Sequence, residues 1–278
     1  MNNWRFVLSK QWAGYLALTI IFAIVCCLLG VWQLNRRTEA QAELAKLDAN
    51  YASEPVPLAD VIPGLDSFDE SDKWTPIVAK GVYLVDEQVL VRNRPYGGRP
   101  GFEVLTPLQL ADGSVFIVDR GWVEPGSDSQ VPKDVPAPPA GVVTVVARLK
   151  AGEPTLANRG APEGQIATIH LPDLARRIDQ PMHTGAYGLL ATETPAVAVA
   201  PFTAAKPIRD EGPHLSYALQ WFVFAIFGFV GLGYGLRQEY RAVNVDDPLE
   251  KERAEEREAR RAAKQKSDAD IEDELLDA

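Results

Sequence analysis

Cysteine and histidine are both scarce in this chain of 278 residues. The two cysteines, Cys26 and Cys27, are neighbours inside a long uncharged run, and only three histidines are present. The rest of the sequence therefore has no disulfide, no thiolate metal site and no cysteine nucleophile. It also lacks a phosphate-binding loop, a dinucleotide fingerprint and a Gly-x-Ser-x-Gly elbow. These absences predict a protein that is not an enzyme, with no catalytic residues and no metal site of its own.

Basic charge is not concentrated in any segment. The chain has 28 Lys and Arg residues against 38 Asp and Glu, a formal net charge of −10. Because no basic patch is available to neutralise phosphates, the charge argues against a nucleic-acid partner. Met182 and His183 could offer a thioether and an imidazole to copper, but adjacent side chains seldom converge on one ion. We therefore interpret them as a loop or partly buried pair.

Two runs of the chain lack charge altogether. Residues 11–35 and 212–236 contain no Asp, Glu, Lys or Arg, and each is longer than the roughly 20 residues that cross a bilayer as a helix. We predict transmembrane helices at 12–34 and 214–236, which excludes a wholly soluble enzyme and a many-pass transporter. The first run exceeds the apolar part of a signal peptide and no small-x-small cleavage site follows it, so we expect an uncleaved anchor.

The segments that flank the spans predict the arrangement in the membrane. Lys and Arg near the membrane ends are almost equally numerous on the two sides, and the further basic residues of the tail favour a cytoplasmic side for both termini. We predict cytoplasmic segments at 1–11 and 237–278 and an extracytoplasmic domain at 35–213. The short, Ser-poor N-terminal segment does not resemble a mitochondrial targeting sequence, which points to a bacterial cell membrane. For the charged tail we favour a solvated and partly disordered segment over a helix. On a helix some of its charged pairs would attract and others repel, so pairing supports a helix only weakly.

Between the spans, the hydrophobic pattern changes from helical to alternating. Thr38–Leu47 has high helix propensity and should extend the first helix, which Pro55 and Pro57 would end. A single short helix is predicted at Leu171–Ile178, and Ala111-Asp112-Gly113 is placed as a hairpin turn. Strands are predicted at 74–83, 88–92, 103–110, 114–119, 142–149, 186–192 and 196–199. The fold class is therefore a membrane protein of the α+β type, with two transmembrane helices flanking one β-rich, mainly antiparallel extracytoplasmic domain and a charged C-terminal tail.

The most informative cluster lies at the start of the second span. His214, Tyr217 and Trp221 are spaced i, i+3, i+7 and form one stripe on a helix, with Pro213 ahead of them. Because the two spans are antiparallel, Trp32 and Gln33 should lie at the same membrane level. Two interpretations stay open from the spacing alone: an interfacial aromatic belt with a hydrated histidine, or a porphyrin or partner site in which the imidazole ligates iron.

A second feature of these spans is a pair of glycines. Gly231 and Gly235 form a small-xxx-small pair that would allow close helix contact, although the signal is weak by itself.

Five motifs in register make the chain resemble the surfeit-locus family of cytochrome c oxidase assembly proteins. They cover roughly residues 12–240, and the two flanking spans agree with the resemblance. The motifs are Leu29–Arg37, Gly81–Tyr83 with Val89–Pro95, Gly101–Leu108, Val118–Val123 and His214–Phe222.

The resemblance implies an assembly factor for haem-copper cytochrome c oxidase that assists insertion of haem a into the main oxidase subunit. Its partners would be that subunit, other assembly factors and the lipid bilayer. His214 occupies the place of the family histidine implicated in haem a binding and is our candidate cofactor-binding residue. That histidine could instead order the start of the helix or contact the oxidase.

The resemblance also bears on the arginines of the β-rich domain. Arg94, Arg99 and Arg120 could meet haem propionates, but salt bridges at strand edges are favoured. In the triplet Arg120-Gly121-Trp122 we expect a structural role, with Gly121 allowing a bulge or close approach and Trp122 in the core.

Two other classes of protein share the two-span arrangement and would have no haem role. A receptor-like protein would need a larger output module than the segment that follows the second span. A polysaccharide chain-length regulator would have an extracytoplasmic part made mainly of long helices, whereas the alternating pattern here predicts strands.

Overall fold

The computed structural model describes residues 4–127, 131–156 and 159–276. The chain divides into two compact units. The helical unit consists of Met1–Glu39 with Glu211–Ala278, and the β-rich unit consists of Ala40–Asp210.

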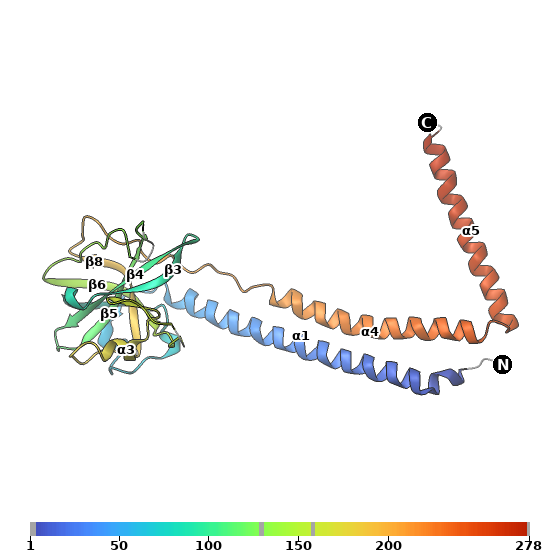
Figure 1. The fold of residues 1–278 in the computed structure, drawn as a ribbon, viewed down its shortest axis with the longest axis horizontal. Coiled ribbons are helices and arrows are strands. Elements are labelled where there is room, and N and C mark those ends of the chain that lie inside the picture. The colour runs from blue at the N-terminus through green and yellow to red at the C-terminus, as the bar shows by residue number, and fades with distance from the viewer. Residues whose placement is uncertain (1–3, 128–130, 157–158, 277–278) are drawn as a thin grey trace. The chain divides into compact units, whose positions relative to one another are not determined.

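Three long helices dominate the helical unit. After the short 3-10 helix η1 (Arg5–Leu8), α1 runs over Lys10–Asn50 and α4 over His214–Val243, and α5 (Pro248–Leu276) forms the tail. Figure 1 shows α1 and α4 side by side, running in opposite directions. Both are long and apolar enough to cross a membrane, which is compatible with a two-span membrane protein.

The first helix is longer than the predicted span. It continues without a break to Asn50, as the helix propensity of Thr38–Leu47 predicted, and ends before Pro55 and Pro57. Its last residues, from Ala40 on, belong to the β-rich unit.

For the tail, a partly disordered segment or a helix was expected, and the structure has the helix. The tail forms α5 because Ala, Glu, Arg and Lys fill its sequence and are strong helix formers. Pro248 stands at the first helical position, where its missing N–H costs nothing. The Asp247 carboxylate accepts a hydrogen bond from the Leu249 amide at 3.0 Å, so it caps the start of the helix.

The β-rich unit is a mainly antiparallel sheet, as predicted. Its strand order is β1-β2-β6-β8-β5-β4-β3-β7, and an additional pairing joins β2 to β4. That pairing closes β2, β6, β8, β5 and β4 into a ring. The strands are β1 (Val56–Pro57), β2 (Pro76–Tyr83), β3 (Val89–Tyr96), β4 (Arg99–Leu110), β5 (Val115–Val123), β6 (Val142–Ala151), β7 (Gln165–Ile166) and β8 (Ala186–Thr194), with α2 (Leu58–Val61), η2 (Glu70–Asp72), η3 (Val85–Glu87) and α3 (Leu171–Ala175) between them.

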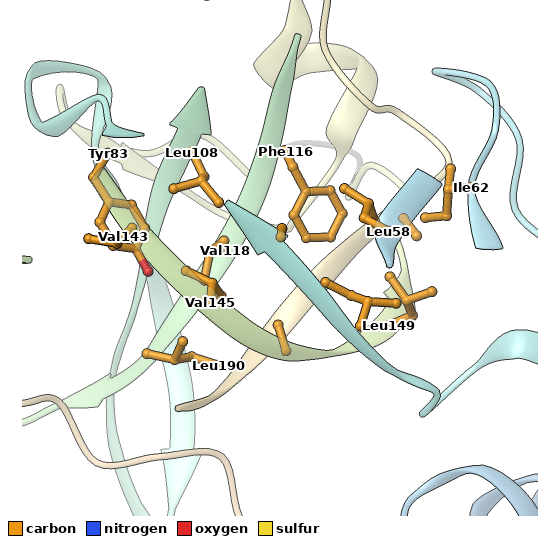
Figure 2. Close-up of a cluster of buried hydrophobic side chains, with 14 residues drawn as sticks. Leu58, Ile62, Tyr83, Leu108, Phe116, Val118, Val143, Val145, Leu149 and Leu190 are labelled. Carbon is orange, nitrogen blue, oxygen red and sulfur yellow. The ribbon is translucent and has the colours of Figure 1, made fainter. Parts of the chain in front are cut away.

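Alternation along the strands sends side chains into two cores. One core contains Phe116 and Val118 of β5 with Val143, Val145 and other apolar residues of the ring (Figure 2). The other contains Val115 and Ile117, from the opposite face of the same strand, together with α3 and β7. β5 is therefore buried on both faces along its whole length.

Three local predictions for this unit needed correction. No strand forms at Ala196–Val199, because Pro195 cannot donate to a strand ladder and ends β8. The predicted helix at Leu171–Ile178 stops at Ala175 and the chain continues in turns. Several strands extend beyond their predicted ends. The Ala111-Asp112-Gly113 turn is confirmed, with the Gly113 amide bonded to Leu110 O at 3.0 Å.

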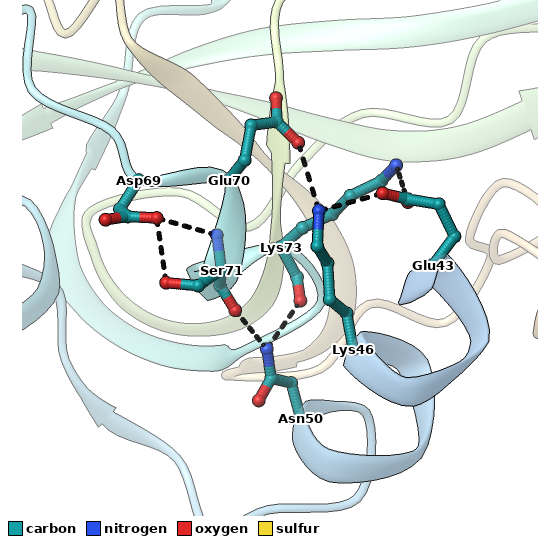
Figure 3. A network of polar contacts seen from close by, with 7 residues as sticks. All are labelled: Glu43, Lys46, Asn50, Asp69, Glu70, Ser71 and Lys73. Atoms are coloured by element: carbon teal, nitrogen blue, oxygen red, sulfur yellow. Dashed lines mark hydrogen bonds and ion pairs between the residues drawn. The ribbon is translucent and has the colours of Figure 1, made fainter. Parts of the chain in front are cut away.

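Polar contacts attach the end of α1 to η2 and the residue that follows it in the β-rich unit (Figure 3). Asn50 Nδ2 donates to the carbonyls of Ser71 at 2.6 Å and Lys73 at 2.9 Å. Glu43 forms ion pairs with Lys46 at 2.8 Å and Lys73 at 2.7 Å. The hydrogen bonds from Lys46 and Lys73 lower the pKa of Glu43, so the network is charged at neutral pH.

Candidate functional site

Small residues form the contact between α1 and α4 within the helical unit. Cys26 and Gly30 of α1 and Ala218 and Ala225 of α4 are buried. A Cβ placed on Gly30 would lie 2.7 Å from Cζ of Phe222, so a side chain there would have to displace that ring. Close approach of helix backbones through small residues is a common device for packing in membranes.

The predicted glycine pair is only partly involved in this contact. A Cβ on Gly231 would meet nothing within 4 Å, whereas one on Gly235 would lie 3.2 Å from the Trp12 ring. Gly228 faces Phe22 instead, at 3.2 Å. The spacing of Cys26 with Gly30 and of Ala218 with Ala225 was the signal in the sequence that would have identified this contact between α1 and α4, called the seam below.

At the end of this seam, His214 meets Gln33. The Nδ1 atom of His214, the first residue of α4, lies 3.0 Å from Oε1 of Gln33 on α1. The predicted juxtaposition of Gln33 with His214 is confirmed. Because an amide oxygen only accepts hydrogen bonds, Nδ1 carries the proton in this pair. The other ring nitrogen, Nε2, then keeps its lone pair and is the atom able to ligate a metal.

Gly212 lies beside the free edge of the imidazole. Its φ is +72°, and a Cβ there would lie 3.2 Å from Nε2 and 3.3 Å from Cδ2 of His214. A side chain at this position would cover the nitrogen that the Gln33 contact leaves available. The Gly-Pro dipeptide before His214 was the available signal, and sequence reasoning missed it. An ion pair between Arg37 and Glu211 at 3.5 Å also joins α1 to the segment that precedes α4.

Two of the aromatic residues near this end of the helix pair are exposed, whereas His214 is half-buried. Tyr217 is 49% exposed and Trp32 is 54% exposed. Trp221 is half-buried and makes an edge contact with Phe224, with ring centroids 5.8 Å apart. Exposed rings at the end of an apolar helix are typical of an interfacial belt, so these side chains and His214 have different surroundings.

The three arginines considered for propionate binding all have carboxylate partners. Arg94 contacts Glu103 at 2.9 Å and Glu153 at 2.6 Å, and Arg99 contacts Glu124 at 3.1 Å. The guanidinium of Arg120 is fully buried, pairs with Glu193 at 3.2 Å and donates to Pro136 O at 2.8 Å. The preference for salt bridges is confirmed, although Arg120 lies in the interior rather than at a strand edge.

The neighbours of Arg120 have the structural roles that the sequence suggested. Gly121 has φ +123°, and a Cβ there would lie 2.4 Å from the carbonyl oxygen of Phe202. Trp122 is 3% exposed. Its Nε1 donates to Arg94 O at 2.9 Å.

A buried carboxyl group was not foreseen. Asp119 on β5 is 2% exposed and accepts a hydrogen bond from the Gly121 amide at 2.9 Å. Burial, together with the nearby Glu103 carboxylate, raises the pKa of Asp119 to about 8. Burial also raises the pKa of Glu103, against the charges of Arg94 and Lys150. The Asp119 carboxyl is therefore largely protonated at neutral pH and serves as a polar part of the core.

The pair considered as a copper site is also part of a core. Met182 is 4% exposed and His183 is 7% exposed. Burial lowers the pKa of the His183 imidazole. Met182 belongs to the same core as α3, which agrees with a packing role.

Together, these observations define a class of protein: a β-rich domain carried between two long apolar helices, with one histidine held at the start of the second helix. Residues 20–226 match the SURF1 family. An uncharacterized SURF1-like protein of Mycobacterium bovis is 33% identical over 260 residues, covering 87% of this chain and 89% of that protein. SURF1-like proteins of Rickettsia felis (28% over 109 residues, 38% of this chain and 45% of theirs) and Dictyostelium discoideum (27% over 132 residues, 45% and 48%) are also similar.

The chain belongs to the SURF1 family, which is the surfeit-locus family that its motifs resemble. This family is known generally as a family of oxidase assembly factors.

Proposed function

We propose that this protein is an assembly factor for haem-copper cytochrome c oxidase that holds haem a through His214 and assists its insertion into the main oxidase subunit. In this proposal haem a is a cargo and the protein has no catalytic turnover of its own. Family membership supports the assembly role. The contact between His214 and Gln33 is the observation that carries the proposed cargo site.

The residues around His214 fit an axial ligand of haem iron. The contact with Gln33 favours the tautomer with the proton on Nδ1, and Gly212 places no side chain of its own beside Nε2. Metal-ligating histidines are normally oriented by a hydrogen bond at the other ring nitrogen in this way. The other histidines of the chain, His170 and His183, belong to the β-rich unit. We therefore expect one protein ligand to the iron and a high-spin haem spectrum.

The proposed setting is a bacterial cell membrane. α1 and α4 would be its two spans, both termini would be cytoplasmic, and the β-rich unit would contact the main oxidase subunit and other assembly factors outside. The length and apolar composition of the two helices support this arrangement.

The cargo site is tested by the absorbance spectrum of the full chain, purified in detergent from cells that make haem a. We expect substoichiometric to equimolar haem in the wild type and a large loss in His214→Ala. His170→Ala is the matched control, because it removes an imidazole from the β-rich unit and should leave the haem content unchanged. Equal haem content in all three proteins would exclude His214 as the ligand while leaving an assembly role intact.

The assembly role is tested separately in a deletion strain. Reduced-minus-oxidised spectra of membranes should show loss of the haem a signal of the oxidase, restored by a plasmid copy of the wild-type chain. A normal oxidase signal in the deletion strain would contradict the assembly role itself.

The alternative of a polysaccharide chain-length regulator loses its support. Such a protein was expected to carry long helices between its spans, whereas the described residues of the β-rich unit form an eight-stranded sheet. Membership of the SURF1 family also argues against it and against the receptor-like alternative.

A further inference from the structure

Three arginines of the β-rich unit gather without carboxylate partners. Arg92, Arg159 and Arg177 line two adjoining cavities of about 440 and 230 Å³, which share Arg159, Gly160 and Ala167 in their walls. Within the described ranges, none of the three forms an ion pair or a side-chain hydrogen bond. Arg94 and Arg120 of the same sheet, by contrast, are paired with carboxylates.

A β-bulge places the first of these arginines. The register of β3 against β4 shifts between Arg92 and Arg94, and Asn93 between them has φ +59°. Bulges re-aim side chains, and asparagine tolerates this conformation better than most residues. Arg94 reaches Glu103 and Glu153. Arg92 faces the cavity, and its Nε atom is buried with no hydrogen-bond partner among the described residues.

An unpaired buried guanidinium nitrogen is costly to the fold. Leaving a buried charged donor without a hydrogen-bond acceptor destabilises the folded state. The Nε atom of Arg120 also lacks a hydrogen bond among the described residues, but the Arg120 guanidinium has Glu193 as an ion-pair partner. An anion in the cavity would supply the corresponding partner to Arg92.

The rest of the lining has the same electrostatic character. Thr155 and Thr168 offer hydroxyl groups, and among the described residues of the two linings Asp173 is the only one with a carboxylate. Asp173 is already engaged, because it lies 3.0 Å from His170 Nδ1 and pairs with Arg176. The unpaired charge that faces the cavities therefore comes from arginine.

We propose that this arginine pocket, formed by Arg92, Arg159 and Arg177, binds a compact ligand that carries phosphate or carboxylate groups. The planar guanidinium group matches both oxyanions through two parallel hydrogen bonds, which makes arginine the preferred residue for such groups. The cavity volumes suit a small molecule or a head group rather than a long polypeptide segment. This inference does not depend on the proposed haem site, since it concerns other residues and uses no oxidase measurement.

The test is isothermal titration calorimetry on the full chain, purified in detergent and held at low ionic strength. Inorganic pyrophosphate and citrate probe a free anion, and glycerophosphoglycerol probes the head group of an anionic phospholipid. We expect saturable binding of at least one probe. Arg92→Gln, Arg159→Gln and Arg177→Gln should each weaken it about tenfold or more.

Two further variants make the result specific. Arg99→Gln removes the same charge from an arginine that already has Glu124 as a partner and should change affinity little. Arg92→Lys keeps the charge but not the two parallel hydrogen bonds, so it should fold normally and still bind more weakly than the wild type. Circular dichroism of each variant verifies the fold.

The relative affinities of the probes distinguish a lipid ligand from a soluble one. A preference for glycerophosphoglycerol over the free anions would assign the pocket to lipid, and the reverse preference would assign it to a soluble metabolite. No binding of any probe, or equal affinity in the wild type and Arg92→Gln, would overturn the proposal. Binding of an acidic peptide without binding of the compact probes would overturn it as well.

Discussion

The contact between Gln33 and His214 joins two side chains that are 181 positions apart in the chain. It gives the imidazole one defined tautomer, because the amide oxygen accepts from Nδ1. A histidine that only ordered the start of α4 would not need Gly212 beside its other nitrogen. Changing Gln33 therefore distinguishes a His214 that ligates a metal from a His214 that only packs at the start of α4.

Replacing Gln33 tests this distinction. Gln33→Leu removes the acceptor but keeps a side chain of similar volume. Loss of the hydrogen-bond partner of a metal-ligating histidine typically lowers metal affinity by about 10- to 100-fold. We expect the haem affinity of the purified protein to fall by that factor. Gln33→Glu retains an acceptor and should retain haem, so similar weakening in both variants would mean that the contact orients nothing. Haem titration followed by absorbance measures both.

The buried carboxyl of Asp119 makes stability depend on pH. Its pKa is about 8 in the folded protein against an ordinary value of 3.8, so between these values the folded state holds more protons than the unfolded state. The free energy of unfolding contributed by this group therefore falls as the pH rises through that window. Below pH 3.8 the Asp119 carboxyl is protonated in both states and does not make the free energy of unfolding depend on pH.

The variant Asp119→Asn should remove this fall. The substituted side chain keeps an oxygen acceptor for the Gly121 amide but cannot ionise. At pH 8 we expect the variant to be more stable than the wild type by about 1 kcal/mol or more, with the difference shrinking towards about pH 4. Urea unfolding of the full chain in detergent at several pH values measures it. A wild type whose stability does not decrease relative to the variant would contradict the raised pKa.

Among the elements, the pair of α1 and α4 depends on Gly30. The Phe222 ring occupies the space where a side chain at residue 30 would stand. A larger residue must displace that ring or separate the helices, and overpacking of this kind costs about 1–3 kcal/mol.

We expect Gly30→Leu to lower the thermal unfolding temperature of the purified chain and to reduce its haem content. Gly231→Leu is the matched control, since a Cβ at Gly231 meets nothing within 4 Å. Differential scanning fluorimetry compares the two variants with the wild type. If Gly231→Leu destabilises the protein as much as Gly30→Leu, the seam at Gly30 is not the contact that holds the helices.

For the whole molecule, the proposed topology predicts which positions are accessible from outside the cell. In a background with Cys26→Ala and Cys27→Ala, Thr203→Cys lies on an exposed part of the β-rich unit and Lys251→Cys on an exposed part of α5. A membrane-impermeant maleimide applied to intact cells should label Thr203→Cys and leave Lys251→Cys unlabelled until the cells are opened. The reverse pattern would invert the orientation, and labelling of both would contradict the two-span arrangement.

Features with a local cause could be predicted well from the sequence. The helices over the two charge-free runs, the extension of α1 and the Ala111-Asp112-Gly113 turn were all predicted, because composition and periodicity within a few residues decide them. The strand predicted at 196–199 was wrong for a local reason as well, because Pro195 ends β8. His214 stood out because it begins the i, i+3, i+7 stripe with Tyr217 and Trp221 at the start of an uncharged run.

The sequence by itself determined that the chain has two apolar helices, a strand-rich segment between them and a distinctive histidine at their boundary. Only the tertiary structure decided that β2 pairs with β4 to close the ring, that Gln33 fixes the tautomer of His214, and which arginines are already neutralised. These outcomes depend on approach between residues far apart in the chain, which no local pattern encodes. Arg92 and Arg94 are two positions apart, yet the bulge at Asn93 gives one of them two carboxylate partners and leaves the other unpaired in a cavity.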